Sequence, residues 1–150
     1  MPSYPAGLPC ALHQEYGLNH VSPLMRSELE SGRARQRRRF TSVPSMANVS
    51  WIMTQAQAVL FEGWFKWTIN DGADWFDMPL SSPMGVKDYE CRFAGMYSGP
   101  RLTGRGMWTF SATLEVRERP VIAEDWIEIA PDYILFMDIF DLAMNREWPT

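Results

Sequence analysis

The sequence predicts a mainly β (α+β) fold, a β-sandwich with one flanking α-helix over about residues 55–70. Two patterns indicate this class. Residues 107–117 alternate apolar and polar side chains, with Trp108, Phe110 and Leu114 on one side, which is the period of a half-buried strand. Residues 55–70 instead repeat apolar positions at helical spacing and are rich in aromatic side chains. Such a helix needs a sheet beneath it.

The predicted helix has a start signal and a stop signal. Thr54 stands at the N-cap position and Gln57 follows three residues later, which is the pattern of a capping box. At the other end, Asn70-Asp71-Gly72 is a stop signal, because Gly72 tolerates the left-handed conformation. Six residues recur at helical spacing and share one face, and Phe61 and Phe65 lie on an adjoining face, so the helix is apolar around much of its girth: Ala56, Val59, Leu60, Gly63, Trp64 and Trp67.

Further strands are predicted on both sides of the helix. Val49, Trp51 and Met53 alternate with outward positions just before it, and a strand ending near Leu80 follows the turn. Residues 81–88 are expected to form a loop, and residues 89–97 another strand. Residues 98–106 are glycine-rich and predict a hairpin with a long tip. The expected core brings together side chains from the helix and the strands: Trp51, Trp64, Phe76, Phe93, Trp108, Phe110 and Leu114.

The chain of 150 residues fits one domain with an extension at each end. Residues 1–25 contain many prolines and glycines without a period, so we predict an extended N-terminal arm that becomes ordered only on assembly. Residues 26–120 form the predicted core domain. Residues 121–150 are acidic and apolar together, and Pro131 divides them. A short amphipathic helix is expected after this proline, in a C-terminal extension that packs on the domain or on a neighbour.

Charge is distributed unevenly, although the net charge is only −4. Residues 26–39 carry six arginines and two glutamates, a net of +4, whereas residues 121–150 carry seven acidic residues and one arginine, a net of −6. The arginines fall on a predicted strand. We expect them to meet acids of a neighbouring subunit. The candidate interface residues are Arg33, Arg35, Arg37, Arg38, Arg39, Asp132, Ile134, Leu135, Asp138, Ile139 and Asp141.

Binding of the arginines to a phosphate backbone is the competing interpretation. Nucleic-acid-binding modules usually offer a recognition helix or an aromatic platform, and the sequence suggests neither here. We therefore predict no specific nucleic-acid partner. No apolar run is long enough to cross a membrane, and the N-terminus does not resemble a secretory signal.

Residues able to do chemistry are sparse, and the sequence predicts neither catalysis nor a cofactor or metal. We interpret His13 and His20, the two histidines of the chain, as ordinary surface residues. Cys10 and Cys91 are expected to be reduced, unreactive thiols. The aspartates at positions 71, 74 and 77 are spaced like calcium ligands, but no acid follows at the twelfth loop position, which favours a turn.

The order of elements carries a resemblance to one protein family. An arginine-rich strand ends at Phe40, a second strand ends at Thr54, and the helix is followed by the segment GADWF (residues 72–76) and Pro79. A strand with Phe93 and the final strand WTFSATLEVRERP complete the series. This layout resembles the small minor tail proteins of long-tailed bacteriophages and, more loosely, their distal tail proteins. The resemblance covers about residues 33–120.

This resemblance implies a non-enzymatic structural protein of the virion. Its expected form is a ring, commonly a hexamer, at the distal end of the tail tube, joining the tube to the baseplate or tail tip. The expected partners are other copies of the chain, the tube protein and the tail-tip or hub proteins, and assembly would occur in the bacterial cytoplasm. Three alternatives stay open: a carbohydrate- or protein-binding β-sandwich presenting Trp75 or Trp108, a monomeric β domain, and an unrecognised enzyme.

Overall fold

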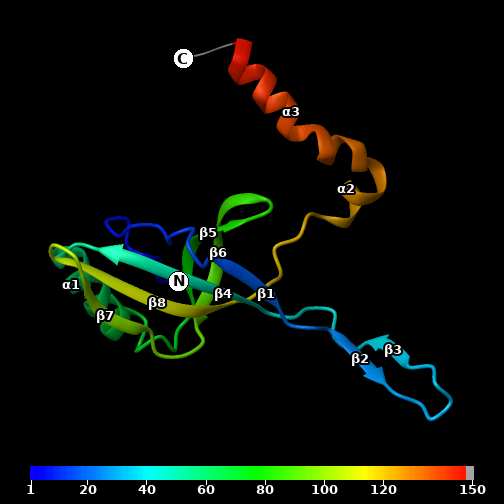
Figure 1. Cartoon of the computed structure of the whole chain (residues 1–150), viewed down its shortest axis with the longest axis horizontal. Coiled ribbons are helices and arrows are strands. Elements are labelled where there is room, and N and C mark those ends of the chain that lie inside the picture. Colours follow the sequence, from blue (N-terminus) through cyan, green and yellow to red (C-terminus); the bar gives the residue numbers. More distant parts are fainter. Residues whose placement is uncertain (148–150) are drawn as a thin grey trace. The chain divides into compact units, whose positions relative to one another are not determined.

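A computed structural model describes residues 1–147, except for the side chains of residues 140, 141, 144, 145 and 147. The chain divides into two compact units, Met1–Arg119 and Pro120–Thr150, here called the core unit and the C-terminal unit. The predicted fold class is confirmed. The chain is mainly β, its sheets are antiparallel, and one helix flanks the large sheet, as in a β-sandwich with a flanking helix (Figure 1).

The structure describes the following helices and strands. The strands are β1 (Gly17–His20), β2 (Leu24–Ser27), β3 (Arg35–Arg38), β4 (Ser45–Met53), β5 (Phe76–Ser82), β6 (Gly85–Phe93), β7 (Ser98–Thr103) and β8 (Met107–Val116). The helical elements are α1 (Gln55–Gly63), the π-helical turn η1 (Trp64–Thr68), α2 (Glu124–Ile129) and α3 (Pro131–Glu147).

Strand β8 is the centre of the large sheet, whose order is β1-β4-β8-β6-β5. One edge of β8 pairs with β4 along its whole length, from Val116 opposite Ser45 to Trp108 opposite Met53. The other edge is shared: β6 pairs with the C-terminal end of β8, and β7 with its N-terminal end. The strongly alternating sequence of β8 therefore belongs to the strand with the most neighbours. Its buried side chains are Phe110, Leu114 and Val116.

Helix α1 begins as predicted. Thr54 Oγ1 accepts from the Gln57 backbone N–H, and the Thr54 N–H donates to Gln57 Oε1 at 3.0 Å, so the capping box is confirmed. The stop signal is also confirmed, since Gly72 has a φ of +86°. A side chain at this position would meet Phe65 Cε2 and Phe93 Cβ at 2.9 Å. Glycine is therefore required both by the backbone conformation and by the close approach of two aromatic rings.

The sequence leaves open which apolar face of the helix lies on the sheet, and the structure decides it. Val59 is 67% exposed and Trp67 is 76% exposed, and Leu60 is exposed as well. The buried side is the adjoining one, formed by Ala58, Phe61, Trp64, Phe65 and Ile69. Both arcs of the helix are apolar, so the period alone did not choose between them. The space between the strands accommodates the aromatic rings of the second arc.

The core is a cluster of aromatic rings centred on Phe61. The Phe61 ring lies 5.4 Å from Trp51, 5.4 Å from Tyr97 and 4.9 Å from Phe110, measured between centroids. Six of the seven predicted core residues are buried. The exception is Trp108, which is only half-buried because it lies at the rim, and its indole N–H donates to Gln55 Oε1 at 3.3 Å.

The N-terminal segment is part of the core unit, and the expectation that it lacks enough apolar surface to order by itself is wrong. Tyr4 and Leu8 are buried, and the Tyr4 ring stacks on Trp51 at 6.4 Å. The segment also joins the sheet at both ends: the Tyr4 N–H donates to Asp77 O at 2.8 Å, and β1 pairs with β4. The burial of Tyr4 and Leu8 and the backbone pairing with the sheet together offset the entropy lost when this segment becomes ordered.

Three predicted boundaries differ from the structure. The loop expected at residues 81–88 is a tight turn, because β5 and β6 pair up to Ser82 opposite Gly85. The strand expected over residues 89–97 ends at Phe93, although Tyr97 still packs on the core. The glycine-rich connection already contains β7, which pairs with β8 to form the expected hairpin. Its tip is short, not long as predicted, because Thr103 already pairs with Met107.

The C-terminal unit consists of two helices, as its amphipathic pattern predicts in part. Pro131 separates α2 from α3, which agrees with the division predicted there. Helix α3 has 17 residues and is longer than the short helix expected. The Trp126 and Tyr133 rings stack at 5.9 Å and fasten the two helices together. No described helix of the chain is both long enough and apolar enough to span a bilayer.

Candidate functional site: an arginine-rich hairpin and an acidic helix pair

The predicted arginine strand is one arm of a hairpin that projects from the large sheet. Pairing of β1 with β4 ends at His20 opposite Ser45, where His20 Nδ1 and Ser45 Oγ lie 2.7 Å apart. The chain between these residues continues outward and folds back on itself as β2 and β3 (Figure 1). Residues 24–39 are called the arginine hairpin below.

Register decides which arginines share a face of this hairpin. Met25 lies opposite Arg37, and Ser27 lies opposite Arg35. Because side chains alternate along a strand, these four residues point to one side. They line a shallow pocket of about 220 Å³ on the hairpin. The Arg37 guanidinium lies 3.7 Å from Met25 Sδ. This face therefore combines two fixed positive charges with an apolar side chain.

All five predicted arginines are on the surface of the core unit. Arg35, Arg37 and Arg38 lie in β3, Arg33 precedes the strand, and Arg39 follows it; each of them is exposed. The Arg39 backbone N–H donates to Pro23 O at 2.7 Å, and its guanidinium lies 5.2 Å from the centroid of the Phe40 ring. Phe40 itself is exposed, so the base of the hairpin adds an aromatic side chain to the charged surface.

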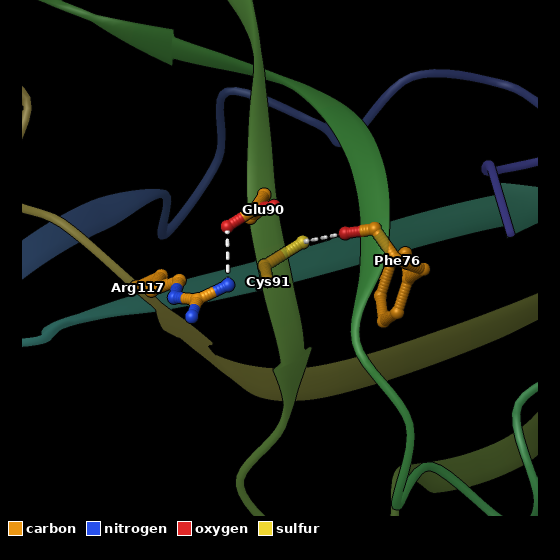
Figure 2. Close-up of polar contacts among 4 residues, drawn as sticks. All are labelled: Phe76, Glu90, Cys91 and Arg117. Atoms are coloured by element: carbon orange, nitrogen blue, oxygen red, sulfur yellow. Dashed lines mark hydrogen bonds and ion pairs between the residues drawn. The ribbon is translucent and has the colours of Figure 1, made fainter. Parts of the chain in front are cut away.

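Ion pairs within the described part of the chain lie elsewhere. Arg92 Nε is 2.8 Å from Glu115 Oε2, and Arg117 Nη1 is 2.9 Å from Glu90 Oε2 (Figure 2). Both pairs lie on the outer side of β6 and β8. Among the described side chains, the arginines of the hairpin have no acidic partner within 4.0 Å. Their positive charge is therefore available to an external acid.

The same outer surface holds Trp75, one of the aromatic residues considered for sugar stacking. The Arg92 guanidinium lies 4.7 Å from the Trp75 ring centroid, and that of Arg117 lies at 5.6 Å. Cation–π contacts of this kind hold the ring within a charged surface network. Trp108, the other candidate, is half-buried and engaged by Gln55. Neither ring is an open aromatic platform.

The acidic half of the predicted interface lies in the C-terminal unit. Asp132, Leu135, Asp138 and Ile139 are exposed on α3, and Ile134 is half-buried. Asp141 falls in α3 by its backbone, and its side chain lies outside the described residues. Most of the large apolar side chains of this unit are also exposed: Trp126, Ile127, Ile129, Tyr133, Leu135, Phe136, Met137, Ile139 and Leu142.

These apolar residues are distributed around the helix rather than along one stripe. Leu135, Ile139 and Leu142 follow one another at spacings of four and three residues and share a face, whereas Tyr133 and Met137 occupy another. A helix that is apolar around its girth is normally buried in a larger assembly. Two helices cannot bury that surface against each other, so the C-terminal unit presents it outward.

The cysteines and histidines do not form a site with these surfaces. Cys91 is fully buried, donates from Sγ to Phe76 O at 3.6 Å (Figure 2), and has its thiol pKa raised by burial to about 12. It is therefore protonated at neutral pH. Cys10 is exposed, and both cysteines are free. Within the described residues, no three or more His, Cys, Asp or Glu side chains gather as a metal site.

The three aspartates considered as calcium ligands belong to a turn and its following strand. Asn70 and Asp71 both have positive φ angles, and Asn70 Nδ2 donates to the Asp74 carboxylate, which closes the turn. Asp77 lies in β5 and pairs through its backbone with the N-terminal segment. The turn interpretation is therefore confirmed.

Comparison of the chain with protein families, with curated proteins and with solved structures finds no match. The functional interpretation therefore rests on the surfaces described above. One part of them was not anticipated from the sequence: Leu24 and Met25 form a strand beside the arginines. The signal was weak, since four residues are too few to establish an alternating period.

Proposed function

We propose that this chain is a structural subunit of a bacteriophage tail. In this proposal it forms a ring, with six copies as the expected number, at the distal end of the tail tube. The ring joins the tube to the baseplate or tail tip, and its other partners are the tube protein and the tail-tip or hub proteins. The chain works in the virion as an assembly component and performs no catalysis.

The observation that carries the proposal is the exposed apolar surface of the C-terminal unit. Ile129 is 82% exposed and Leu135 is 74% exposed, and they belong to a set of large apolar side chains within one short segment. Monomeric proteins rarely leave such residues together in water, and an exposed apolar patch marks a site of protein association. The layout of residues 33–120 resembles that of minor tail proteins, and this resemblance is the reason for proposing a phage tail as the assembly.

A ring is supported by the unlike character of the two charged surfaces. Closed rings arise from heterologous contacts, in which one patch of a subunit meets a different patch of the next. The chain carries a basic hairpin in the core unit and an acidic, apolar pair of helices in the C-terminal unit. A two-fold dimer would instead require each surface to bind its own copy, whereas here each surface is complementary in charge to the other one.

The test is the mass and shape of the purified full chain. Native mass spectrometry and negative-stain imaging should give closed rings at micromolar concentration. Leu135→Asp together with Ile139→Asp should abolish the rings, because two charges would be buried at the contact. Met96→Asp, which places a charge at an exposed loop residue of the core unit, is the matched control and should leave the rings intact.

Two outcomes would contradict the proposal. A wild-type chain that stays monomeric throughout this concentration range does not form rings. Rings that survive the double substitution in α3 are built from some other surface, which removes the observation on which the proposal rests. A separate check is genomic: the gene should lie near one that encodes a tape-measure protein, and a neighbourhood without tail genes would contradict the assignment to a phage tail.

A further inference from the structure

The arginine hairpin has a structural feature that calls for a partner. It contains only four residue pairs, and every residue of β2 and β3 is exposed. A two-stranded hairpin alone in water is marginally stable at best, because neither of its faces buries apolar surface. Leu24, Met25 and Leu29 nevertheless add exposed apolar side chains to it. A hairpin of this composition is stabilised when one of its faces is covered.

We propose that the arginine hairpin of one copy of this chain binds helix α3 of a second copy. This inference rests on the proposed function, because it names the two surfaces that meet within the ring. Residues 26–39 have a net charge of +4 and residues 121–150 a net charge of −6, so the surfaces are complementary in sign. Both also carry exposed apolar side chains, which supply contact area, while the charges select the partner.

The dimensions of the two elements are compatible. Arg35 and Arg37 are two residues apart on one face of a strand, which separates them by about 7 Å. Asp132 and Asp138 are six residues apart on α3, which separates them by about 9 Å along the helix axis and by about 120° around it, so they lie on the two sides of the face that carries Leu135 and Ile139. Extended arginine side chains cover the difference, and each planar guanidinium can meet a carboxylate through two hydrogen bonds.

Pairing of the acidic helices with each other is disfavoured by the same charges. Two copies of α3 side by side would bring together two helices that each carry four acidic residues and one arginine, a net charge of −3. Like charges directly opposed at an interface weaken association and reject that partner. The hairpin offers the opposite sign. A hairpin-to-helix contact is also heterologous, so its repetition builds a ring when the rotation between neighbouring subunits closes.

The experiment exchanges charges between two full-length variants. One is the hairpin variant, Arg35→Glu with Arg37→Glu, and the other is the α3 variant, Asp132→Arg with Asp138→Arg. Each variant alone should associate at least about 100-fold more weakly than wild type, because like charges then face each other. When the two are mixed, opposite charges face each other again, and assemblies that contain both variants in equal number should form, as read by native mass spectrometry.

The matched control is Arg101→Glu with Arg105→Glu, which makes the same charge change on exposed arginines of the β7–β8 hairpin. It should assemble like wild type. Circular dichroism and the melting temperature establish that each variant is folded. If a reversal variant fails to fold, Arg35→Gln with Arg37→Gln and Asp132→Asn with Asp138→Asn replace it. A separate measurement uses the wild-type chain. Its association should weaken as salt is added, because salt screens the ion pairs, and insensitivity to salt would overturn the inference.

The outcomes separate this inference from the proposed function. If wild type forms rings and the reversal variants also form them, or their mixture does not restore assembly, the inference fails and the ring remains. If the hairpin variant assembles and the α3 variant does not, α3 binds another surface and the inference fails. A monomeric wild type, as expected if each hairpin bound its own α3, contradicts the proposed function itself.

Discussion

The two units use apolar side chains in opposite ways. In the core unit, the rings of Trp51, Phe61 and Phe110 are fully buried between the strands and α1. In the C-terminal unit, Phe136, Leu135 and Ile139 are just as apolar but are exposed. The difference is the number of layers: a sheet, a helix and an N-terminal segment enclose a core, whereas two helices enclose very little. Apolar composition alone therefore does not indicate which residues stabilise the isolated chain.

The largest expected difference lies between two matched phenylalanines. Phe61→Ala should lower the free energy of unfolding by about 3–5 kcal/mol, because it removes the centre of the aromatic cluster and leaves a cavity. Phe136→Ala, at a side chain that is 59% exposed, should change it by less than about 0.5 kcal/mol. Urea unfolding under conditions that keep the chain monomeric measures both. Equal losses would show that the C-terminal unit is buried in the monomer.

A pair of leucines tests whether the N-terminal segment belongs with the enclosed region. Leu8 is buried and Leu135 is exposed. Leu8→Ala should destabilise the chain by about 2–3 kcal/mol, near the lower end for buried leucines because the segment has room to adjust. Leu135→Ala should have little effect on the monomer. Hydrogen exchange supplies a second readout. We expect slow exchange at the Tyr4 amide, which donates to Asp77 O, and rapid exchange there would show that the segment is a free arm.

The buried thiol gives the stability of the core unit a dependence on pH. Burial, with a smaller contribution from the charge of Asp77, raises the pKa of Cys91 from 9.0 to about 12. Between these values the unfolded thiol ionises while the folded thiol stays protonated, so unfolding releases a proton. Stability therefore falls as the pH rises through this window, by up to about 1.4 kcal/mol per pH unit from this group.

Cys91→Ala should make that slope less steep, because it removes the group whose pKa differs between the folded and unfolded chain. Cys10→Ala, at the exposed cysteine, is the control and should leave the slope unchanged. Urea unfolding at several pH values between 9 and 11 gives the slope for each variant. If Cys91→Ala keeps the wild-type slope, other groups, such as Tyr4 with its burial-raised pKa, account for the dependence.

The smallest expected difference concerns the helix starts. Helix α1 has a capping box, so Thr54→Ala should cost about 1 kcal/mol and Thr54→Ser should retain most of the stability. Helix α2 begins at Glu124, and its N-cap residue, Ala123, offers no side-chain cap. Ala123→Ser should therefore slow amide exchange in α2 while leaving the unfolding of the core unit unchanged. A shift of the global unfolding transition by Ala123→Ser would mean that the two units unfold together.

The candidate interface could be predicted from composition and alternation, but its geometry could not. The arginines of β3 and the acids of α3 are visible as charged runs, and charged side chains need no partner within the chain to be on the surface. The pairing of Met25 with Arg37 depends on hairpin register, which four-residue strands specify weakly. The exposure of Ile129 also escaped prediction, since an apolar side chain by itself does not indicate whether another layer of the fold covers it.

By itself, the sequence determined the elements whose causes are local. The capping box at Thr54, the glycine at position 72 and the alternation in β8 act over a few residues, and each is where the pattern predicts. The tertiary structure decided which of two apolar arcs of α1 faces the sheet. It also decided that Tyr4 closes the core and that Trp108 stays at the rim. Those outcomes depend on the space left between strands distant in sequence, and close packing admits only the side chains that fill it.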